Sequence, residues 1–176
     1  MIREKGIGTL LAAAEKLDGK TNVFFDVFGD ADPSEKNRVA LEDIKLPSNV
    51  RFHGAVEFEQ LADFLKAAHC VCLPTVYGEG LPRILLEGAA YGCCLIATDA
   101  PGCNDLIEDG ETGFLLPVMH QDALAQRLTE VLAQLAENPK HAKSMGRTGR
   151  SQLEGSKFTT QSVRSQFQKI LSNLYA

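Results

Sequence analysis

Apolar positions alternate along the chain between two spacings, which predicts an alternation of helices and strands. In residues 5–17 apolar side chains recur every three or four positions, the helical period, whereas residues 94–98, CLIAT, form a continuous apolar run typical of a buried strand. By these criteria strands are expected at 23–29, 50–54, 70–74, 94–98 and 113–117. Helices are expected at 5–17, 34–44, 57–68, 82–91, 121–136, 139–153 and 158–175, with a short one inside PGCNDLIEDG at 101–110.

This element order predicts the fold class. Strands that are apolar on both faces and separated by helices indicate a parallel sheet covered on both sides. Right-handed crossovers then give a doubly wound, Rossmann-like α/β domain, which we expect over residues 1–155, with a separate C-terminal helix in 156–176. Ligands of such sheets lie at the carboxyl ends of the strands, so the loop at 75–81 is the expected ligand side.

Composition narrows the function classes. The chain has 176 residues, 44% of them hydrophobic, and a formal net charge of −5, which disfavours nucleic acid as the main partner. No apolar run approaches the roughly 20 residues that span a bilayer, and MIREKGIGTL lacks the apolar core of a signal peptide, so a cytoplasmic location is expected. The odd number of cysteines, five, favours buried free thiols over disulfides.

Two glutamates bracket the most informative segment, EGLPRILLE. Glu79 lies in a glycine-containing loop, and Glu87 lies in an otherwise apolar predicted helix that begins at Pro82. Free amides and the dipole at such a helix start form an anion site, which suits a phosphate or diphosphate. Glu87 would lie about 7.5 Å further along the helix, where its carboxylate could accept hydrogen bonds from a ribose. The spacing alone leaves open that both glutamates are ordinary solvated residues.

The surrounding residues resemble a known family. The segment LPTVYGEGLPRILLEGAAYGCCLIATDAPGCNDLIEDGETGFLLP is similar to the donor-binding domain of retaining GT-B-type glycosyltransferases, the glycosyl transferases group 1 family. The likeness extends upstream through VRFHGAVEFEQLADFL and EKGIGTLLAAAEKL. The segments EGLPR and DAPGC are most similar to the corresponding segments of bacterial enzymes that build surface polysaccharides or lipid-linked oligosaccharides.

The resemblance implies a role for each matching residue. Glu87 would hold the ribose of the donor nucleotide, and Glu79 would face the donor sugar as the candidate catalytic residue. The remaining donor-binding positions implied are Lys5 at the diphosphate, Val56 in the loop beside the base, and Gly80, Leu81 and Pro82 in the phosphate loop. No cofactor or metal is implied; the nucleotide diphosphate sugar is a substrate, with a UDP-sugar favoured over a GDP-sugar.

The chain also departs from the family pattern. In the family a strand ending in an arginine precedes the EKG motif, and here that position falls before Met1. We therefore expect the C-terminal half of a GT-B fold that lacks its first strand, inactive without an N-terminal acceptor domain or a partner that supplies it. Peripheral association with the inner face of the membrane would occur through that missing domain. The alternatives are a nucleotide-sugar 2-epimerase, a non-catalytic nucleotide-sugar-binding or interaction subunit, and a fragment without independent function.

Overall fold

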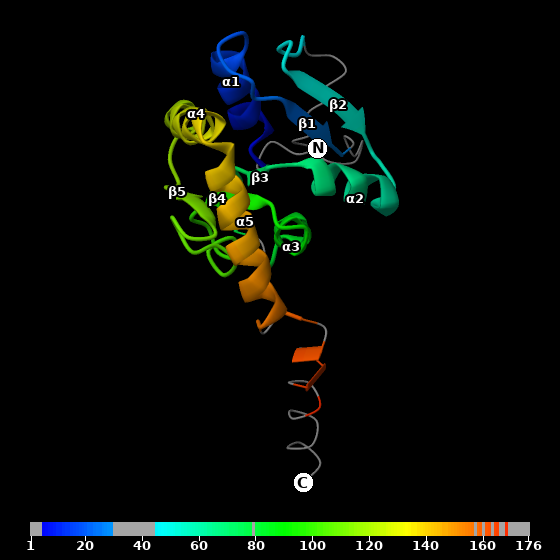
Figure 1. Cartoon of the computed structure of the whole chain (residues 1–176). Helices are drawn as coiled ribbons and strands as arrows, with labels where there is room; N and C mark the ends of the chain where they lie inside the picture. Colours follow the sequence, from blue (N-terminus) through cyan, green and yellow to red (C-terminus); the bar gives the residue numbers. More distant parts are fainter. Residues whose placement is uncertain are drawn as a thin grey trace, which may run out of the picture.

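A computed structural model of the chain describes residues 5–29, 45–78 and 80–156, together with some residues between 158 and 168 (Figure 1). Its helices are α1 (Ile7–Leu17), α2 (Phe58–Ala67), α3 (Arg83–Ala90), α4 (Gln121–Glu137) and α5 (Pro139–Glu154). Its strands are β1 (Phe25–Phe28), β2 (Val50–Gly54), β3 (Cys70–Leu73), β4 (Cys94–Thr98) and β5 (Gly113–Leu116). The predicted helices at 34–44 and, for the most part, 158–175 lie outside the described residues.

Every described strand pairing is parallel, as predicted, but the strands form two sheets instead of one. β1 pairs with β2, and β3, β4 and β5 form a second sheet in that order. In the general strand order of doubly wound folds, the first strand lies between the two strands that correspond to β1 and β3 here. The two sheets are therefore separated at the position of that strand. Helix α1 links the two sheets, since its apolar side packs into one core with Phe25 and Val27 of β1 and Ile96 of β4.

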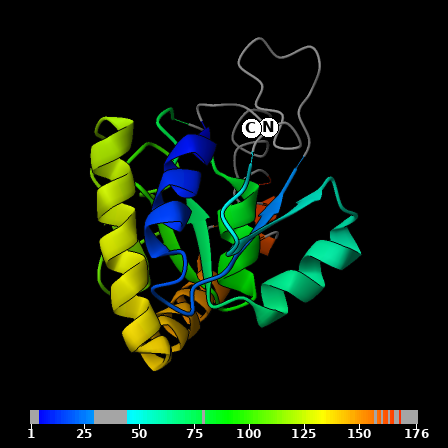
Figure 2. The same ribbon diagram turned by 90° about the horizontal axis from the view of Figure 1, so that it is seen from above.

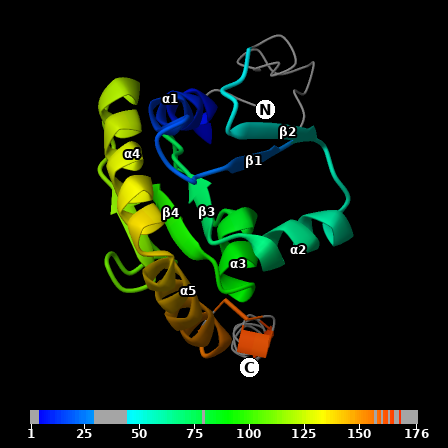
Figure 3. The ribbon, with the colours of Figure 1, turned by 45° about the horizontal axis from the view of Figure 1, so that its top comes forward.

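β4 shows most directly that the larger sheet is covered on both faces. Its side chains alternate between two cores: Cys94 and Ile96 pack on the side of α1 and α4, and Leu95 and Ala97 pack on the side of α2 and α3. Figures 2 and 3 show these helix pairs on opposite sides of β3 and β4. All five residues of β4 are buried, which explains why the sequence there is an uninterrupted apolar run. The expected doubly wound α/β architecture is confirmed.

Two local predictions were wrong. Residues 101–106 form consecutive turns instead of a short helix, because Gly102 adopts φ 88°, a left-handed conformation that stops a helix within its first turn. Pro82 is the residue that caps α3, with an extended ψ of 115°, and not its first helical residue.

The cysteines are core residues, as expected. All five are free thiols, and Cys93, Cys94 and Cys103 are buried. Burial, and to a smaller extent the thiol of Cys70, raises the pKa of Cys93 to about 11. This thiol therefore stays protonated at neutral pH and acts as a small apolar group.

Helix α5 is held against the rest of the domain by a close backbone contact. It packs on α3 and β4 (Figure 1). A Cβ placed on Gly146 would lie only 1.9 Å from the carbonyl oxygen of Gly92, in the turn between α3 and β4. The position therefore requires glycine, although glycine is a poor residue for the interior of a helix.

We expect Gly146→Ala to lower the free energy of unfolding by about 1–3 kcal/mol, because the added methyl group forces α5 away from Gly92. Gly149→Ala is the matched control, since its Cβ would meet Thr112 at an ordinary 3.4 Å. This control should be neutral or stabilising by up to about 1 kcal/mol through helix propensity. Urea denaturation followed by circular dichroism measures both variants, and equal effects would contradict the close contact.

Candidate functional site

The loop that follows β3 is fixed by the end of β4. The hydroxyl of Thr98 donates to the carbonyl oxygen of Thr75, and the Thr75 hydroxyl donates to the carbonyl oxygen of Tyr77 at 3.1 Å. Gly78 lies beside the ring of Pro101 in the loop that follows β4. The two loops at the carboxyl edge of the larger sheet are therefore tied together, and this is the predicted ligand side.

Lys5 is placed at the same edge by the residue that follows it. Gly6 caps α1 with φ 81°, and a Cβ there would lie 1.9 Å from the carbonyl oxygen of Pro74. The start of α1 therefore lies directly against the end of β3. This contact brings Lys5, the first residue of the described chain, to the beginning of the 75–82 loop.

The predicted phosphate loop ends at the N-terminus of α3. Gly80 is exposed, Leu81 is half-buried and Pro82 is buried. Because Pro82 has no side-chain oxygen, it cannot cap the first amides of α3, and no acidic residue lies in the first turn. The positive end of the helix dipole thus has no negative side chain of its own helix beside it, which suits an external anion.

Glu87 lies one turn into α3 and is partly buried, with 19% of its side chain exposed. Its Oε1 atom is 3.3 Å from Nη2 of Arg83, four residues earlier, whose side chain is 84% exposed. This pair leaves the second carboxylate oxygen of Glu87 available for another donor. Sequence reasoning missed Arg83, although the spacing of four residues on a helix was a usable signal.

Val56 follows the carboxyl end of the smaller sheet. It is half-buried in the loop after β2, where Gly54 accepts a hydrogen bond from the amide of Gly29 at 2.8 Å. The same end of the sheet is ordered by His53, whose Nε2 lies 2.7 Å from Oδ1 of Asp26. The His53 ring also stacks on Phe28 at 4.8 Å, so this histidine has a structural role.

Glu79, the predicted catalytic residue, lies outside the described residues. Of the other predicted positions, Lys5 precedes Gly6, which lies against Pro74 at the end of β3, and Gly80, Leu81 and Pro82 lead into α3. Glu87 lies further along the same helix, and Val56 lies at the end of the other sheet.

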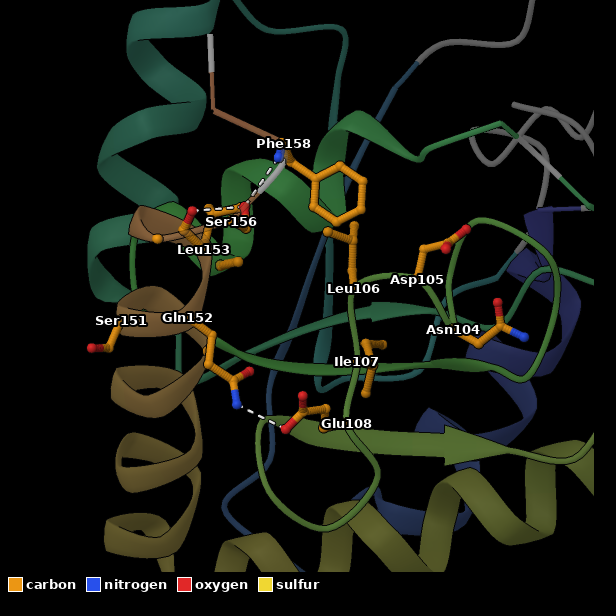
Figure 4. A pocket seen from close by; sticks show the side chains of 13 residues that line it. Asn104, Asp105, Leu106, Ile107, Glu108, Ser151, Gln152, Leu153, Ser156 and Phe158 are labelled. Atoms are coloured by element: carbon orange, nitrogen blue, oxygen red, sulfur yellow. Dashed lines mark hydrogen bonds between the residues drawn. The ribbon is translucent and has the colours of Figure 1, made fainter. Parts of the chain in front are cut away.

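Two cavities flank α3 on the side of α5. One of about 460 Å³ lies between segment 104–108 and the end of α5, where Gln152 donates to Glu108 at 2.8 Å (Figure 4). The other, of about 470 Å³, includes Glu87 and Phe158 in its wall. Neither of these two cavities is lined by Lys5 or by the described residues of the 75–82 loop.

The described residues contain no group of three histidine, cysteine or acidic side chains placed to hold a metal ion. Nor do they contain a helix long and apolar enough to traverse a bilayer.

Comparison with known proteins identifies the family. The family model described as Glycosyl transferases group 1 matches residues 1–152. The chain belongs to this family. Its fold is the C-terminal half of the GT-B architecture of retaining glycosyltransferases, as the sequence resemblance implied.

Curated members of the family include two similar bacterial proteins. Phosphatidyl-myo-inositol mannosyltransferase of Mycolicibacterium smegmatis is 31% identical over 129 residues, which are 73% of this chain and 33% of that protein. The putative colanic acid biosynthesis glycosyltransferase WcaL of Salmonella typhimurium is 26% identical over 136 residues, 74% of this chain and 34% of that protein. The chain thus spans about a third of the length of these relatives.

Solved structures share the fold over nearly the whole chain. The Anabaena protein HepE in complex with UDP-glucose superimposes with a TM-score of 0.83 at 20% identity, covering 98% of this chain and 46% of that one. The pneumococcal O-GlcNAc transferase GtfA in complex with UDP and GlcNAc gives a TM-score of 0.80 at 22% identity, covering 98% and 34%.

We expect Gly6→Ala to lower the free energy of unfolding by roughly 2 kcal/mol or more, since the methyl group meets both an unfavourable φ and the Pro74 carbonyl. Gly19→Ala is the matched control: its φ is also positive, at 68°, but its Cβ would have nothing within 4 Å. The control should cost only about 1 kcal/mol. Denaturant titration gives the difference between the two variants, and faster amide exchange at 75–78 in Gly6→Ala alone would locate the disturbance beside Pro74.

Proposed function

We propose that this chain is the donor-binding half of a retaining glycosyltransferase that transfers a sugar from a nucleotide diphosphate sugar to an acceptor hydroxyl. Membership of the glycosyl transferases group 1 family supports the reaction class. The observation that carries the donor assignment is the arrangement at the carboxyl edge. There the start of α1, which carries Lys5, abuts the end of β3, and the N-terminus of α3 follows with Glu87 one turn further on.

Each group has a distinct task in this proposal. Lys5 and the first amides of α3 stabilise the negative charge that develops on the departing diphosphate, because they are already in place before the reaction. The loop of Gly80, Leu81 and Pro82 lets the phosphates approach the backbone closely. Glu87 accepts hydrogen bonds from the ribose hydroxyls, and Val56 borders the base.

Glu79 is proposed to face the donor sugar while the bond from its anomeric carbon to the diphosphate breaks. A carboxylate there would help position a sugar that acquires positive charge in the transition state. The incoming acceptor oxygen attaches to the same face, so the configuration at that carbon is retained.

A UDP-sugar is the proposed donor, supported by the UDP and UDP-glucose named in the complexes of HepE and GtfA. The acceptor side would come from an N-terminal domain, on the same polypeptide or on a partner, because the chain spans only about a third of its curated relatives. We place the full reaction in surface polysaccharide or glycolipid assembly, as the names of those relatives suggest. Contact with the inner face of the membrane would then involve that N-terminal domain.

Glu87→Gln should weaken binding of UDP by about 10- to 100-fold, since a charged acceptor of hydrogen bonds contributes about 1.5–3 kcal/mol. It should leave binding of 2′,3′-dideoxy-UDP unchanged, because that ligand has no ribose hydroxyls to lose. Isothermal titration calorimetry with both ligands tests the ribose role separately from the phosphate role.

Glu130→Gln is the control for this variant, because Glu130 also pairs with an arginine of its own helix, at 3.2 Å from Arg127, and lines neither cavity. It should bind UDP like the unmodified chain. UDP should also slow amide exchange at 75–87, and Glu87→Ala should remove this protection. Undiminished protection in that variant would count against the ribose assignment.

Lys5→Gln should reduce affinity for UDP by roughly 10-fold while leaving affinity for uridine unchanged, because a charge-assisted contact to the diphosphate is lost. Lys16→Gln, an exposed lysine near the other end of α1, is the control and should change neither. A Lys5 variant that loses uridine and UDP equally would show that Lys5 acts on the fold and not on the phosphates.

A further inference from the structure

Helix α5 carries a row of cations along one side. Lys140, Lys143, Arg147 and Arg150 follow one another at steps of three, four and three residues, which places them on a single helical face. At about 1.5 Å per residue the row is about 15 Å long. We call these four residues the basic row.

The basic row is exposed and mostly uncompensated. All four side chains are exposed, and of the ion pairs between described residues only that of Arg150 with Glu154, at 3.1 Å, involves this row. Among the described residues no acidic side chain forms an ion pair with Lys140, Lys143 or Arg147. Three cations of one helix face therefore have no acidic partner within the described part of the chain, whose formal net charge over the whole sequence is −5.

The orientation of this row is set by the packing of the opposite side of α5. Ala142, Met145 and Gly146 are buried, and Gly146 fits directly against the backbone of Gly92. Because this contact tolerates no side chain, the helix cannot rotate about its axis without opening the core. Figure 1 shows α5 along the outside of the domain, with one side against α3 and β4. The cations are thus presented in a fixed direction.

The exposed side of α5 offers charge but no apolar anchor. The exposed large apolar side chains of the described residues lie elsewhere: Phe24, Phe58, Val76, Tyr77 and Val118. Stable protein interfaces have a desolvated core with aromatic or aliphatic anchors, which this face lacks. A surface of closely spaced negative charges can bind several cations without any apolar contact, so it is the kind of partner that suits this face.

We propose that the basic row docks α5 on an anionic phospholipid surface. Each Lys or Arg close to such a surface adds about fivefold in affinity, so a row of cations gives reversible binding. The Debye length is about 10 Å at 0.1 M salt, so acids elsewhere on the chain are screened while the row touches the headgroups. Duplex nucleic acid is a weaker candidate, since phosphate tracking depends on wider basic surfaces than this row provides on an acidic chain.

This docking surface goes beyond the proposed donor chemistry and is independent of it. Lys140, Lys143 and Arg147 lie outside the candidate donor site and do not line the cavity that contains Glu87, so a variant that changes these three should bind UDP normally. Loss of vesicle binding with retained UDP binding, or the reverse, therefore separates a failure of one proposal from a failure of the other.

The test is cosedimentation of the full 176-residue chain with phospholipid vesicles. Vesicles of equal parts phosphatidylglycerol and phosphatidylcholine should bind it, and vesicles of phosphatidylcholine alone should not. Binding should fall steeply between about 0.05 M and about 0.3 M salt. The variant K140Q/K143Q/R147Q should lose roughly 100-fold in affinity for the anionic vesicles, which is about fivefold for each of its three charges.

A matched variant controls for net charge. K16Q/K66Q/R127Q also removes three exposed cations, but these are paired with Gln126, Asp63 and Glu130. It should lose only a few-fold. Gln is well tolerated in helices, and circular dichroism would verify that both variants remain folded.

Three outcomes would overturn the proposal. They are equal binding to phosphatidylcholine vesicles, equal loss in the two triple variants, and tighter binding at the same salt to poly-glutamate or duplex DNA than to anionic vesicles. The last would reassign the basic row to an acidic protein or a nucleic acid.

Discussion

The contact between Gly6 and the carbonyl of Pro74 determines where the candidate site lies. A helix start and a strand end can approach this closely only if the residue between them has no side chain and can adopt a positive φ, and Gly6 meets both conditions. Through this contact a cation from the beginning of the chain reaches a loop that follows residue 74. Thr98 then ties that loop to the end of β4. The site is thus assembled from three separate parts of the sequence, by one close backbone contact and one hydrogen bond from a buried threonine hydroxyl.

The same principle governs the other side of the domain. α5 approaches the turn at Gly92 only because Gly146 has no side chain, and Ala142 and Met145 fill the core around the contact. Both contacts join a helix backbone to the chain at an end of the larger sheet, one at the carboxyl end of β3 and the other before β4 begins. They hold the outer helices in a fixed orientation to the strands. Lys5, which directly precedes the cap of α1, and the basic row on α5 are therefore positioned by contacts in the interior.

Sequence reasoning succeeded where burial on both faces leaves an unambiguous pattern. The bounds of β2 and β4 were predicted without error, and the helices at α1, α2, α4 and α5 to within about two residues, because continuous or periodic apolar runs indicate them directly. The short helix at 101–110 was wrong because one glycine conformation outweighed helical periodicity. The division into two sheets depends on pairings distant in sequence, which local patterns do not record. Thr98 was missed for the same reason, since its partner lies 23 residues away.

The ion pair of Arg83 and Glu87 matters more for the candidate site than for the stability of the fold. Exposed ion pairs contribute little to stability, about 0.2–1 kcal/mol, and Arg83 is too exposed for the pair to matter much to the fold. Its effect on Glu87 is different, because a partly buried carboxylate is costly unless it has a partner. Arg83 supplies that partner through Oε1 and so keeps the carboxylate oriented on α3, with Oε2 left over. In the proposed function, a ribose hydroxyl would donate a hydrogen bond to Oε2, the carboxylate oxygen that Arg83 does not contact. Arg83 is a cation at the first position of α3, where it is unfavourable beside the positive end of the helix dipole. Its ion pair with Glu87 and the phosphate expected nearby account for its presence there.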